Sequence, residues 1–377
     1  MSIPLLDLGV LYTRQREAIQ KALLDVAEHG AFIKGPEVGL FEDECAAWLG
    51  HGAHVIGVAN GSDAIVLALL ALGIGPGDEV VCPAFTFVST ATSVSLVGAT
   101  PVFCDVDAAT FNVTTASMME RVGPQTKAVI PVHLFGRPVD VPDLRRALDA
   151  AGRDDVRIIE DVAQAFGAWV RGQRVSTFGD AATLSFFPAK NLGAFGDAGG
   201  VVTPHEDVAD RVRMLGQHGS RVKYENVEIG YNSRLDTIQA AVLRVRLPAL
   251  DGWIDERRAN AARYDAAFAD LDPERVALPL GDDPSIELVH SFNQYTLRVA
   301  DRDGLHAELR EAGIGSAIYY PRTLAEQACF ASLDPDPDAV PVSRDLCKQV
   351  LSIPIYPGLP ADHQAAVIDA IRAHATR

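Results

Sequence analysis

Short, uninterrupted apolar runs alternate with segments of helical periodicity along the chain as far as Pro248. The apolar runs predict seven buried strands, at residues 55–59, 79–82, 101–104, 128–132, 156–160, 182–186 and 200–203. Helix-length segments such as 63–72 and 141–151 lie between them. Because apolar strands without alternation are buried on both faces, this order predicts an α/β fold with a mostly parallel seven-stranded sheet covered by helices.

The pattern changes after Pro248, where a predicted helix at residues 235–247 ends. Beyond it the sequence predicts helices at 249–271, 302–312 and 343–350, and strand-like segments at 292–299 and 315–320. Another helix is expected at 13–29, before the first strand. We therefore predict a large domain of residues 1–248 and a smaller α+β domain of residues 249–377.

Composition limits the classes of function. The chain has 377 residues and a net charge of −17, and this acidity argues against a nucleic-acid partner, which requires a basic surface. The longest apolar run, residues 64–75, is too short to span a bilayer, and the first residues do not resemble a signal peptide. Five cysteines without a C-x-x-C pair are typical of a reducing compartment, so we expect a cytoplasmic protein. His51 and His54 have no third ligand nearby, so we expect no metal site.

A lysine and an acid follow two of the predicted strands. Lys190 lies just past the strand at 182–186, behind Pro188, and Asp161 follows the strand at 156–160. The carboxyl ends of parallel strands meet at one edge of a sheet, where ligands bind. A pyridoxal phosphate (PLP) enzyme needs both groups, because the lysine carries the cofactor as a Schiff base and the acid keeps its ring nitrogen protonated. The alternatives are a solvated lysine and an aspartate that caps the following turn.

Other residues suit the remaining parts of this cofactor. The candidates for its phosphate are Gly61, Ser62, Asp63 and Ser185. The first three open an apolar helix, whose free N–H groups can bind an anion, although simple capping is the alternative. Phe87 can stack on the ring or pack in the core. Gln164 can reach the phenolic oxygen.

Together these motifs resemble the DegT/DnrJ/EryC1/StrS family of PLP-dependent nucleotide-sugar aminotransferases, over nearly the whole chain. The matching blocks are Gly35-Pro36-Glu37-Val38, Asn60-Gly61-Ser62-Asp63-Ala64, Pro83-Ala84-Phe85-Thr86-Phe87, Glu160-Asp161-Val162-Ala163-Gln164, Ser185-Phe186-Phe187-Pro188-Ala189-Lys190 and Gly230-Tyr231-Asn232-Ser233-Arg234-Leu235-Asp236. The resemblance implies the aspartate-aminotransferase-like fold, PLP fold type I. It also implies a homodimer whose subunits share their active sites.

The resemblance implies a role for each cofactor residue. Lys190 would bear PLP, Asp161 would contact the pyridine nitrogen, Gln164 the phenolic oxygen, and Phe87 the face of the ring. The phosphate would lie among Gly61, Ser62, Asp63 and Ser185.

The substrate residues are also implied by the resemblance. Asn232 of one subunit would reach the phosphate of the cofactor in the neighbouring subunit, and Arg234 would face the substrate of that same site. Tyr319, Tyr320 and His133 are expected to line the substrate pocket.

The expected reaction moves an amino group from L-glutamate to a nucleotide-linked keto sugar and leaves 2-oxoglutarate. The block around Asn232 is similar to that of enzymes that aminate a 3-keto sugar. One branch uses UDP-2-acetamido-3-keto-hexuronic acids for surface polysaccharides, and another uses dTDP-3-keto-6-deoxyhexoses. We expect the first, because Arg234 can pair with a uronate carboxylate.

Two other classes are weighed against this expectation. PLP-dependent sugar dehydratases share the fold but carry histidine in place of the lysine. A non-catalytic PLP-fold sensor would need an effector domain, and the sequence shows no basic helix-turn-helix segment.

Overall fold

The computed structural model describes residues 2–376 and contains a seven-stranded sheet. Its strands are β1 (His54–Val58), β2 (Glu79–Pro83), β3 (Thr100–Cys104), β4 (Thr126–Val129), β5 (Arg157–Asp161), β8 (Ala181–Ser185) and β9 (Gly199–Thr203). They lie in the order β1-β9-β8-β5-β4-β2-β3. Strand β9 is antiparallel to both of its neighbours, and the other paired strands are parallel. The predicted α/β fold with a mostly parallel sheet is therefore confirmed.

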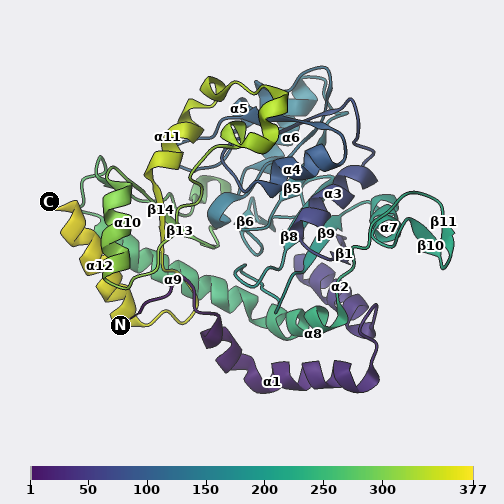
Figure 1. The fold of residues 1–377 in the computed structure, drawn as a ribbon, viewed down its shortest axis with the longest axis horizontal. Helices are drawn as coiled ribbons and strands as arrows, with labels where there is room; N and C mark the ends of the chain where they lie inside the picture. Colours follow the sequence, from purple (N-terminus) through teal and green to yellow (C-terminus); the bar gives the residue numbers. More distant parts are fainter. Residues whose placement is uncertain (1, 377) are drawn as a thin grey trace.

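Helices cover both faces of this sheet (Figure 1). The helices of this part of the chain are α1 (Leu8–His29), which packs on α8, and α2 (Pro36–Leu49), α3 (Gly61–Ala71), α4 (Ser89–Leu96), α5 (Thr115–Met119), α6 (Val141–Ala150), α7 (Glu206–Leu215) and α8 (Thr237–Arg246). Alternate strand residues enter different cores: Val80 and Cys82 of β2 pack against α3, whereas Val81 packs on the α6 side. Burial on both faces explains why these strands are apolar without alternation.

The chain after α8 builds a smaller layer beside the large sheet. It consists of α9 (Leu250–Phe268), β12 (Val276–Ala277), β13 (Tyr295–Val299), α10 (Arg302–Glu311), α11 (Pro341–Gln349), β14 (Val350–Ile353) and α12 (Ala361–Ala375). Strands β12, β13 and β14 form an antiparallel sheet. Helix α9 connects the two parts, because Trp253 lies in a core of the large sheet and Tyr264 in the core of the small one. The domain boundary at residue 248 stays a prediction.

Residues 315–320 do not form the strand that the sequence predicts. Ala317 makes an isolated bridge with Ser352 of β14, and regular pairing stops there. The chain then turns so that Tyr319 and Tyr320 line a cavity beside the large sheet. Packing of Ile318 against two of the cores and the lining of the cavity by the tyrosines, rather than sheet pairing, account for the apolar character of this segment.

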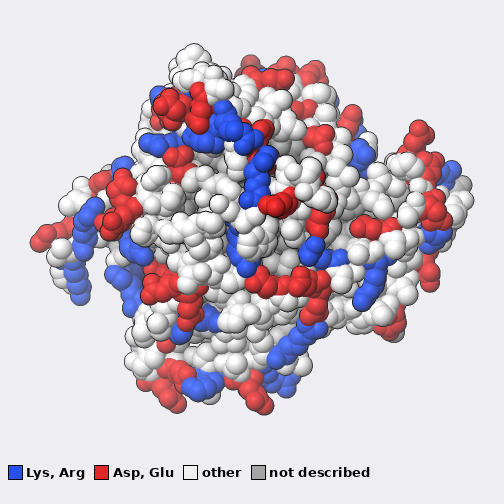
Figure 2. All heavy atoms as spheres, turned by 180° about the vertical axis from the view of Figure 1, so that it is seen from behind, with Lys and Arg blue, Asp and Glu red and all other residues white. Residues whose placement is uncertain are grey.

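Two short hairpins extend from the main layers. They are β6 (Trp169–Val170) with β7 (Gln173–Arg174), and β10 (Ser220–Val222) with β11 (Glu225–Asn226). The second hairpin projects from the body of the molecule beyond α7 (Figure 1). Among the described residues, no helix combines the length and apolar character that a membrane span requires. Acidic and basic side chains are intermixed on the face seen in Figure 2.

Candidate active site

A cavity of about 520 Å³ lies at the carboxyl ends of β5 and β8. We call it the Lys190 cavity. Its lining includes these polar, charged and aromatic residues: Asn60, Ser62, Thr86, Phe87, Ser89, Thr90, Asp161, Gln164, Thr183, Ser185, Lys190, Asp197, Gln294, Tyr319 and Tyr320. Asp161 is the last residue of β5, and Lys190 follows β8. The structure therefore has Lys190 and Asp161 at the same edge of the sheet, as the sequence predicts.

Lys190 is presented by a tight turn after β8. The backbone N–H of Lys190 donates to the carbonyl of Phe187 at 2.8 Å, with Pro188 at the second position of the turn, where its fixed φ is favourable. The chain then returns, and the N–H of Ala194 donates to the carbonyl of Phe186. The turn directs the lysine into the cavity and not along the outer surface.

The environment of Lys190 changes its ionisation. Burial lowers the pKa of the ammonium group from its usual value of 10.5 to about 8, while the negative charge of Asp161 acts in the opposite direction. Near neutral pH about a tenth of the Nζ amine is uncharged, far more than for a solvated lysine. An amine with this uncharged fraction can act as a nucleophile and as a base.

Asp161 is a buried carboxyl group that accepts a hydrogen bond at each of its two oxygens. Its Oδ2 accepts from the hydroxyl of Thr90 at 2.9 Å, and its Oδ1 accepts from the N–H of Ala163 at 3.1 Å. Burial raises the pKa of Asp161, and these two bonds and the charge of Lys190 oppose that rise. The group is thus arranged to bind a cationic N–H.

The start of α3 lies against the end of β8. Asn60 caps the helix by accepting from the N–H of Asp63 at 2.8 Å. A Cβ added at Gly61 would lie 2.8 Å from the Cβ of Ser185, so only glycine permits this approach. The approach brings Ser185 and the first N–H groups of the helix to one end of the cavity, which is a suitable place for an anion.

Replacing Gly61 with alanine is expected to lower the free energy of unfolding by about 1–3 kcal/mol, because the added methyl group overlaps Ser185. Urea denaturation checks this value. Gly252→Ala near the start of α9 is the matched control, since a Cβ there meets nothing within 4 Å. It should stabilise the protein by about 0.5–1 kcal/mol. Equal effects of the two substitutions would contradict the close approach at Gly61.

Aromatic and amide side chains form the opposite wall of the cavity. Phe87 is half exposed to the cavity, and its ring centroid lies 6.2 Å from that of Tyr320. Gln164 is fixed between two groups: Oε1 accepts from the N–H of Phe135 at 2.7 Å, and Nε2 donates to the hydroxyl of Tyr320 at 3.0 Å. Burial raises the pKa of Tyr320. The tyrosine hydroxyl therefore stays protonated and can donate into the cavity.

Four of the predicted site residues lie outside the lining of the Lys190 cavity: Asp63, His133, Asn232 and Arg234. Asp63 contributes its N–H to the cap of α3, and its side chain is not part of the lining. His133 is fully buried behind the cavity wall rather than facing the pocket. Its Nδ1 accepts from the N–H of Val139, which leaves Nε2 to donate to Glu160 at 3.2 Å. The sequence could not exclude His133, because its position follows a strand end just as Asp161 does.

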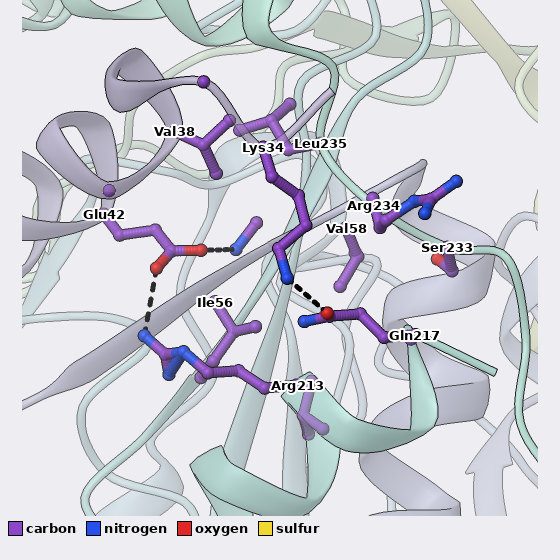
Figure 3. A pocket seen from close by; sticks show the side chains of 15 residues that line it. Lys34, Val38, Glu42, Ile56, Val58, Arg213, Gln217, Ser233, Arg234 and Leu235 are labelled. Atoms are coloured by element: carbon purple, nitrogen blue, oxygen red, sulfur yellow. Dashed lines mark hydrogen bonds and ion pairs between the residues drawn. The ribbon is translucent and has the colours of Figure 1, made fainter. Parts of the chain in front are cut away.

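Asn232 and Arg234 also lie apart from the Lys190 cavity of their own chain. Asn232 is exposed and pairs through its backbone with Gln217. Arg234 lines a second cavity of about 320 Å³, the Lys34 cavity, on the side opposite Glu42 (Figure 3). Within one chain, neither residue lines the Lys190 cavity. This separation agrees with, and does not test, their expected action on a neighbouring subunit.

Seven polar residues of the Lys190 cavity are not among the predicted site residues: Ser89, Thr90, Gln294, Asn60, Thr86, Thr183 and Asp197. The first two follow Phe87 in the opening turn of α4, so the spacing from Phe87 to Thr90 was an available signal. Gln294 lies just before β13, far along the chain, and nothing local connects it to Lys190. Packing of the small sheet against the large one brings it there.

Relatives resemble this chain over its whole length. A protein of Geobacillus stearothermophilus named a pleiotropic regulatory protein is 42% identical, with 98% of both chains covered. UDP-N-acetyl-3-dehydro-alpha-D-glucosamine 3-aminotransferase of Acidithiobacillus ferrooxidans is 41% identical and covers 98% of this chain and 97% of its own. dTDP-3-amino-3,4,6-trideoxy-alpha-D-glucose transaminase of Streptomyces venezuelae is 40% identical, with 100% and 97% covered.

Solved structures show the same architecture. S. venezuelae DesV in complex with a ketimine intermediate superposes with a TM-score of 0.95 at 40% identity, and covers 100% of this chain and 99% of its own. NtdA of Bacillus subtilis, with the bound cofactor PMP, has a TM-score of 0.91 at 30% identity, with 100% and 86% covered. The aspartate-aminotransferase-like fold expected from the resemblance is thereby confirmed. The model of the DegT/DnrJ/EryC1/StrS aminotransferase family matches residues 13–372, and this chain belongs to that family.

Proposed function

We propose that this protein is a PLP-dependent aminotransferase that moves the amino group of L-glutamate to a nucleotide-linked 3-keto sugar. The observation that carries the proposal is the single cavity that joins Lys190 to Asp161 at the ends of β5 and β8. The aminotransferase class follows from family membership. The residue roles and the sugar are our proposals.

The residues of the Lys190 cavity fit PLP. An amine with a lowered pKa lies in the same cavity as a buried carboxylate, and the glycine at position 61 lets the start of α3 come close to Ser185, where an anion can bind both. Lys190 would hold the aldehyde carbon, Asp161 the ring nitrogen, Phe87 the ring face, and Ser62 and Ser185 the phosphate. When bound, PLP supplies an aldehyde that takes up an amino group and a protonated ring that accepts an electron pair.

The chain's own groups then carry out the proton movements. The Nζ amine of Lys190 would take a proton from the Cα carbon of glutamate and deliver it to the C4′ carbon of the cofactor. Asp161 remains ionised beside the ring nitrogen. Gln164 would contact the phenolic oxygen of PLP, and Tyr320, to whose hydroxyl its amide donates, would orient the substrate. Amination of the keto sugar repeats the same movements in reverse.

The rate at which the apoprotein takes up PLP is expected to rise with pH and level off above about pH 8. Only the neutral amine attacks an aldehyde, and the pKa of Lys190 is lowered to about 8. Below that pKa the neutral fraction falls about tenfold for each pH unit. Stopped-flow absorbance measures the rate. A rate that still rises tenfold between about pH 9 and pH 10, as for an ordinary lysine, would contradict the lowered pKa.

The substrate proposal rests on the relatives and on Arg234. One relative is named for a UDP-linked 3-dehydro sugar with an N-acetyl group, and another for a dTDP-linked 3-amino sugar. Both names place the amino group at carbon 3 of a nucleotide sugar. We propose a UDP-2-acetamido-3-keto-hexuronic acid, because the guanidinium of Arg234 can pair with the uronate carboxylate. The dTDP-3-keto-6-deoxyhexose is the second candidate.

We further propose a homodimer with shared sites, acting in the cytoplasm in polysaccharide biosynthesis. Apolar side chains around the β10–β11 hairpin are exposed: Ile229 by 95%, Tyr224 by 87% and Val227 by 67%. Such a patch is typical of an interface. The patch lies next to Asn232 along the chain, so a second copy packed on it would lie close to Asn232.

Mixing inactive Lys190→Ala protein with inactive Asn232→Ala protein is expected to restore activity. Each mixed dimer with shared sites contains one site in which both residues are intact. Subunits are exchanged under mild denaturant, and activity is compared with that of each variant alone. If Asn232 acts within its own chain, the mixture stays inactive.

The sugar is tested in the reverse direction. Purified holoenzyme is incubated with 2-oxoglutarate and either the UDP-linked 3-amino hexuronate or the dTDP-linked 3-amino-6-deoxyhexose, and glutamate is measured. We expect glutamate from the first compound. Glutamate from the dTDP compound alone would transfer the assignment to the second candidate, and glutamate from neither would refute both.

The name of the Geobacillus relative raises regulation as another function. An enzyme, but not a sensor, should exchange amino groups with glutamate. Adding L-glutamate to the yellow holoprotein should therefore bleach its visible absorbance and release 2-oxoglutarate. An unchanged spectrum would favour the regulatory function.

A further inference from the structure

The opening turn of α4 touches two ends of the Lys190 cavity. The hydroxyl of Ser89 donates to the hydroxyl of Ser62 at the start of α3. The next residue, Thr90, donates through its hydroxyl to Oδ2 of Asp161 at the end of β5. Phe87, which lies just before the helix, lines the space between these two contacts. The opening turn of α4 thus contacts both Ser62, at the end of the cavity where an anion can bind, and the carboxylate of Asp161.

We propose that Thr90 is a positioning residue that keeps the Asp161 carboxylate ionised and turned toward the ring nitrogen of PLP. The inference rests on the proposed function, because it concerns the same cofactor site. Nothing in the sequence motifs assigns a role to Thr90, and the structure brings it to Asp161 from 71 positions earlier in the chain.

The contact between Thr90 and Asp161 is shielded from water. Thr90 is 1% exposed and Asp161 is 5% exposed. Because the N–H of Ala163 holds Oδ1 while Thr90 holds Oδ2, the carboxylate cannot rotate about its Cβ–Cγ bond without losing a hydrogen bond. Each oxygen of a carboxylate has two lone-pair sites, so a site remains free for a ligand N–H. The orientation is thereby fixed before the cofactor arrives.

A threonine hydroxyl is a suitable donor for keeping Asp161 ionised. Burial opposes ionisation of Asp161, and a hydrogen bond to the charged form restores it. A hydroxyl does so without a positive charge of its own, so it does not compete with a protonated ring for the carboxylate. His133, which also lies near Asp161, cannot replace it, because its ring nitrogens are engaged by Val139 and Glu160.

The test compares how the apoprotein binds PLP and 1-deaza-PLP, in which a C–H group replaces the ring nitrogen. Thr90→Val keeps the shape and removes the hydroxyl, and Thr90→Ser keeps the hydroxyl. We expect Thr90→Val to weaken PLP binding on the order of tenfold or more, the usual effect of losing a hydrogen bond to a charged group. It should not weaken binding of the deaza compound, and Thr90→Ser should bind both as the wild type does.

Several results would overturn the proposal. Equal weakening of both compounds by Thr90→Val would mean a packing role, and no weakening of either would mean no role. If Thr90→Ser weakened PLP binding as much as Thr90→Val does, the hydroxyl would not be responsible, and the proposal would be overturned. In an Asp161→Asn background, Thr90→Val should have no further effect on PLP binding, and a full tenfold effect there would also overturn it. Wild-type protein that binds the two compounds equally would refute the role of Asp161 itself, and with it the proposed cofactor geometry.

Discussion

Replacing Lys190 with alanine is expected to lower kcat for transamination by on the order of 10⁴-fold, because the substitution removes both the covalent attachment and the proton carrier. The turn that presents residue 190 is made by backbone bonds, so alanine leaves the fold intact. The half-reaction with glutamate, followed by absorbance in single turnovers, measures the loss directly. Far-ultraviolet circular dichroism and the melting temperature should stay close to those of the wild type.

Lys348→Ala is the matched control for this substitution. Its side chain on α11 is 71% exposed and pairs with Asp345 at the surface, a type of contact that contributes little. We expect wild-type kcat for it. A Lys190→Ala protein that keeps more than about a hundredth of the wild-type rate would show that another group moves the proton.

Replacing Asp161 with asparagine is expected to lower kcat by on the order of 10²- to 10³-fold, with a smaller effect on the KM for glutamate. Removing one partner of a buried ion pair typically costs roughly 3–5 kcal/mol. The ion pair between Asp161 and the ring nitrogen would lower the energy of the transition state more than that of the bound substrate, because the ring accepts negative charge there. Asparagine keeps the shape, and its oxygen can still accept from Thr90. Steady-state kinetics separate kcat from KM.

The control is Asp369→Asn, an exposed aspartate on α12. It changes the net charge by the same amount and should leave both constants unchanged. If Asp161→Asn raised only KM, the carboxylate would bind substrate and would not support the ring, which would contradict the proposed role. If the two substitutions had the same effect, overall charge and not position would be responsible.

Much of the fold could be predicted because its signals are local. Seven apolar runs gave the seven strands, since each is short, continuous and separated from the next by helical periodicity. The segment at 315–320 was misassigned for the same reason: a run of apolar residues indicates burial, but not whether the partner is a strand or a cavity wall. The two tyrosines in it line the Lys190 cavity.

The positions of Lys190 and Asp161 could also be predicted from residues close to them in the chain. Lys190 and Asp161 each follow an apolar strand, and the geometry of parallel sheets brings such positions to one edge without further information. His133 follows a strand in the same way, yet it is buried against Glu160. The sequence specifies that a residue is near the edge, whereas the direction of its side chain depends on its neighbours.

The sequence by itself therefore determined the sheet, the edge that carries chemistry, and the lysine and acid on that edge, because these depend on periodicity and on residues close together in the chain. Only the tertiary structure decided which side chains complete the cavity. Thr90 reaches Asp161, Tyr320 reaches Gln164, and Arg234 lies at a separate cavity. These contacts join segments far apart in sequence, and their geometry is set by how the helices and the second sheet pack.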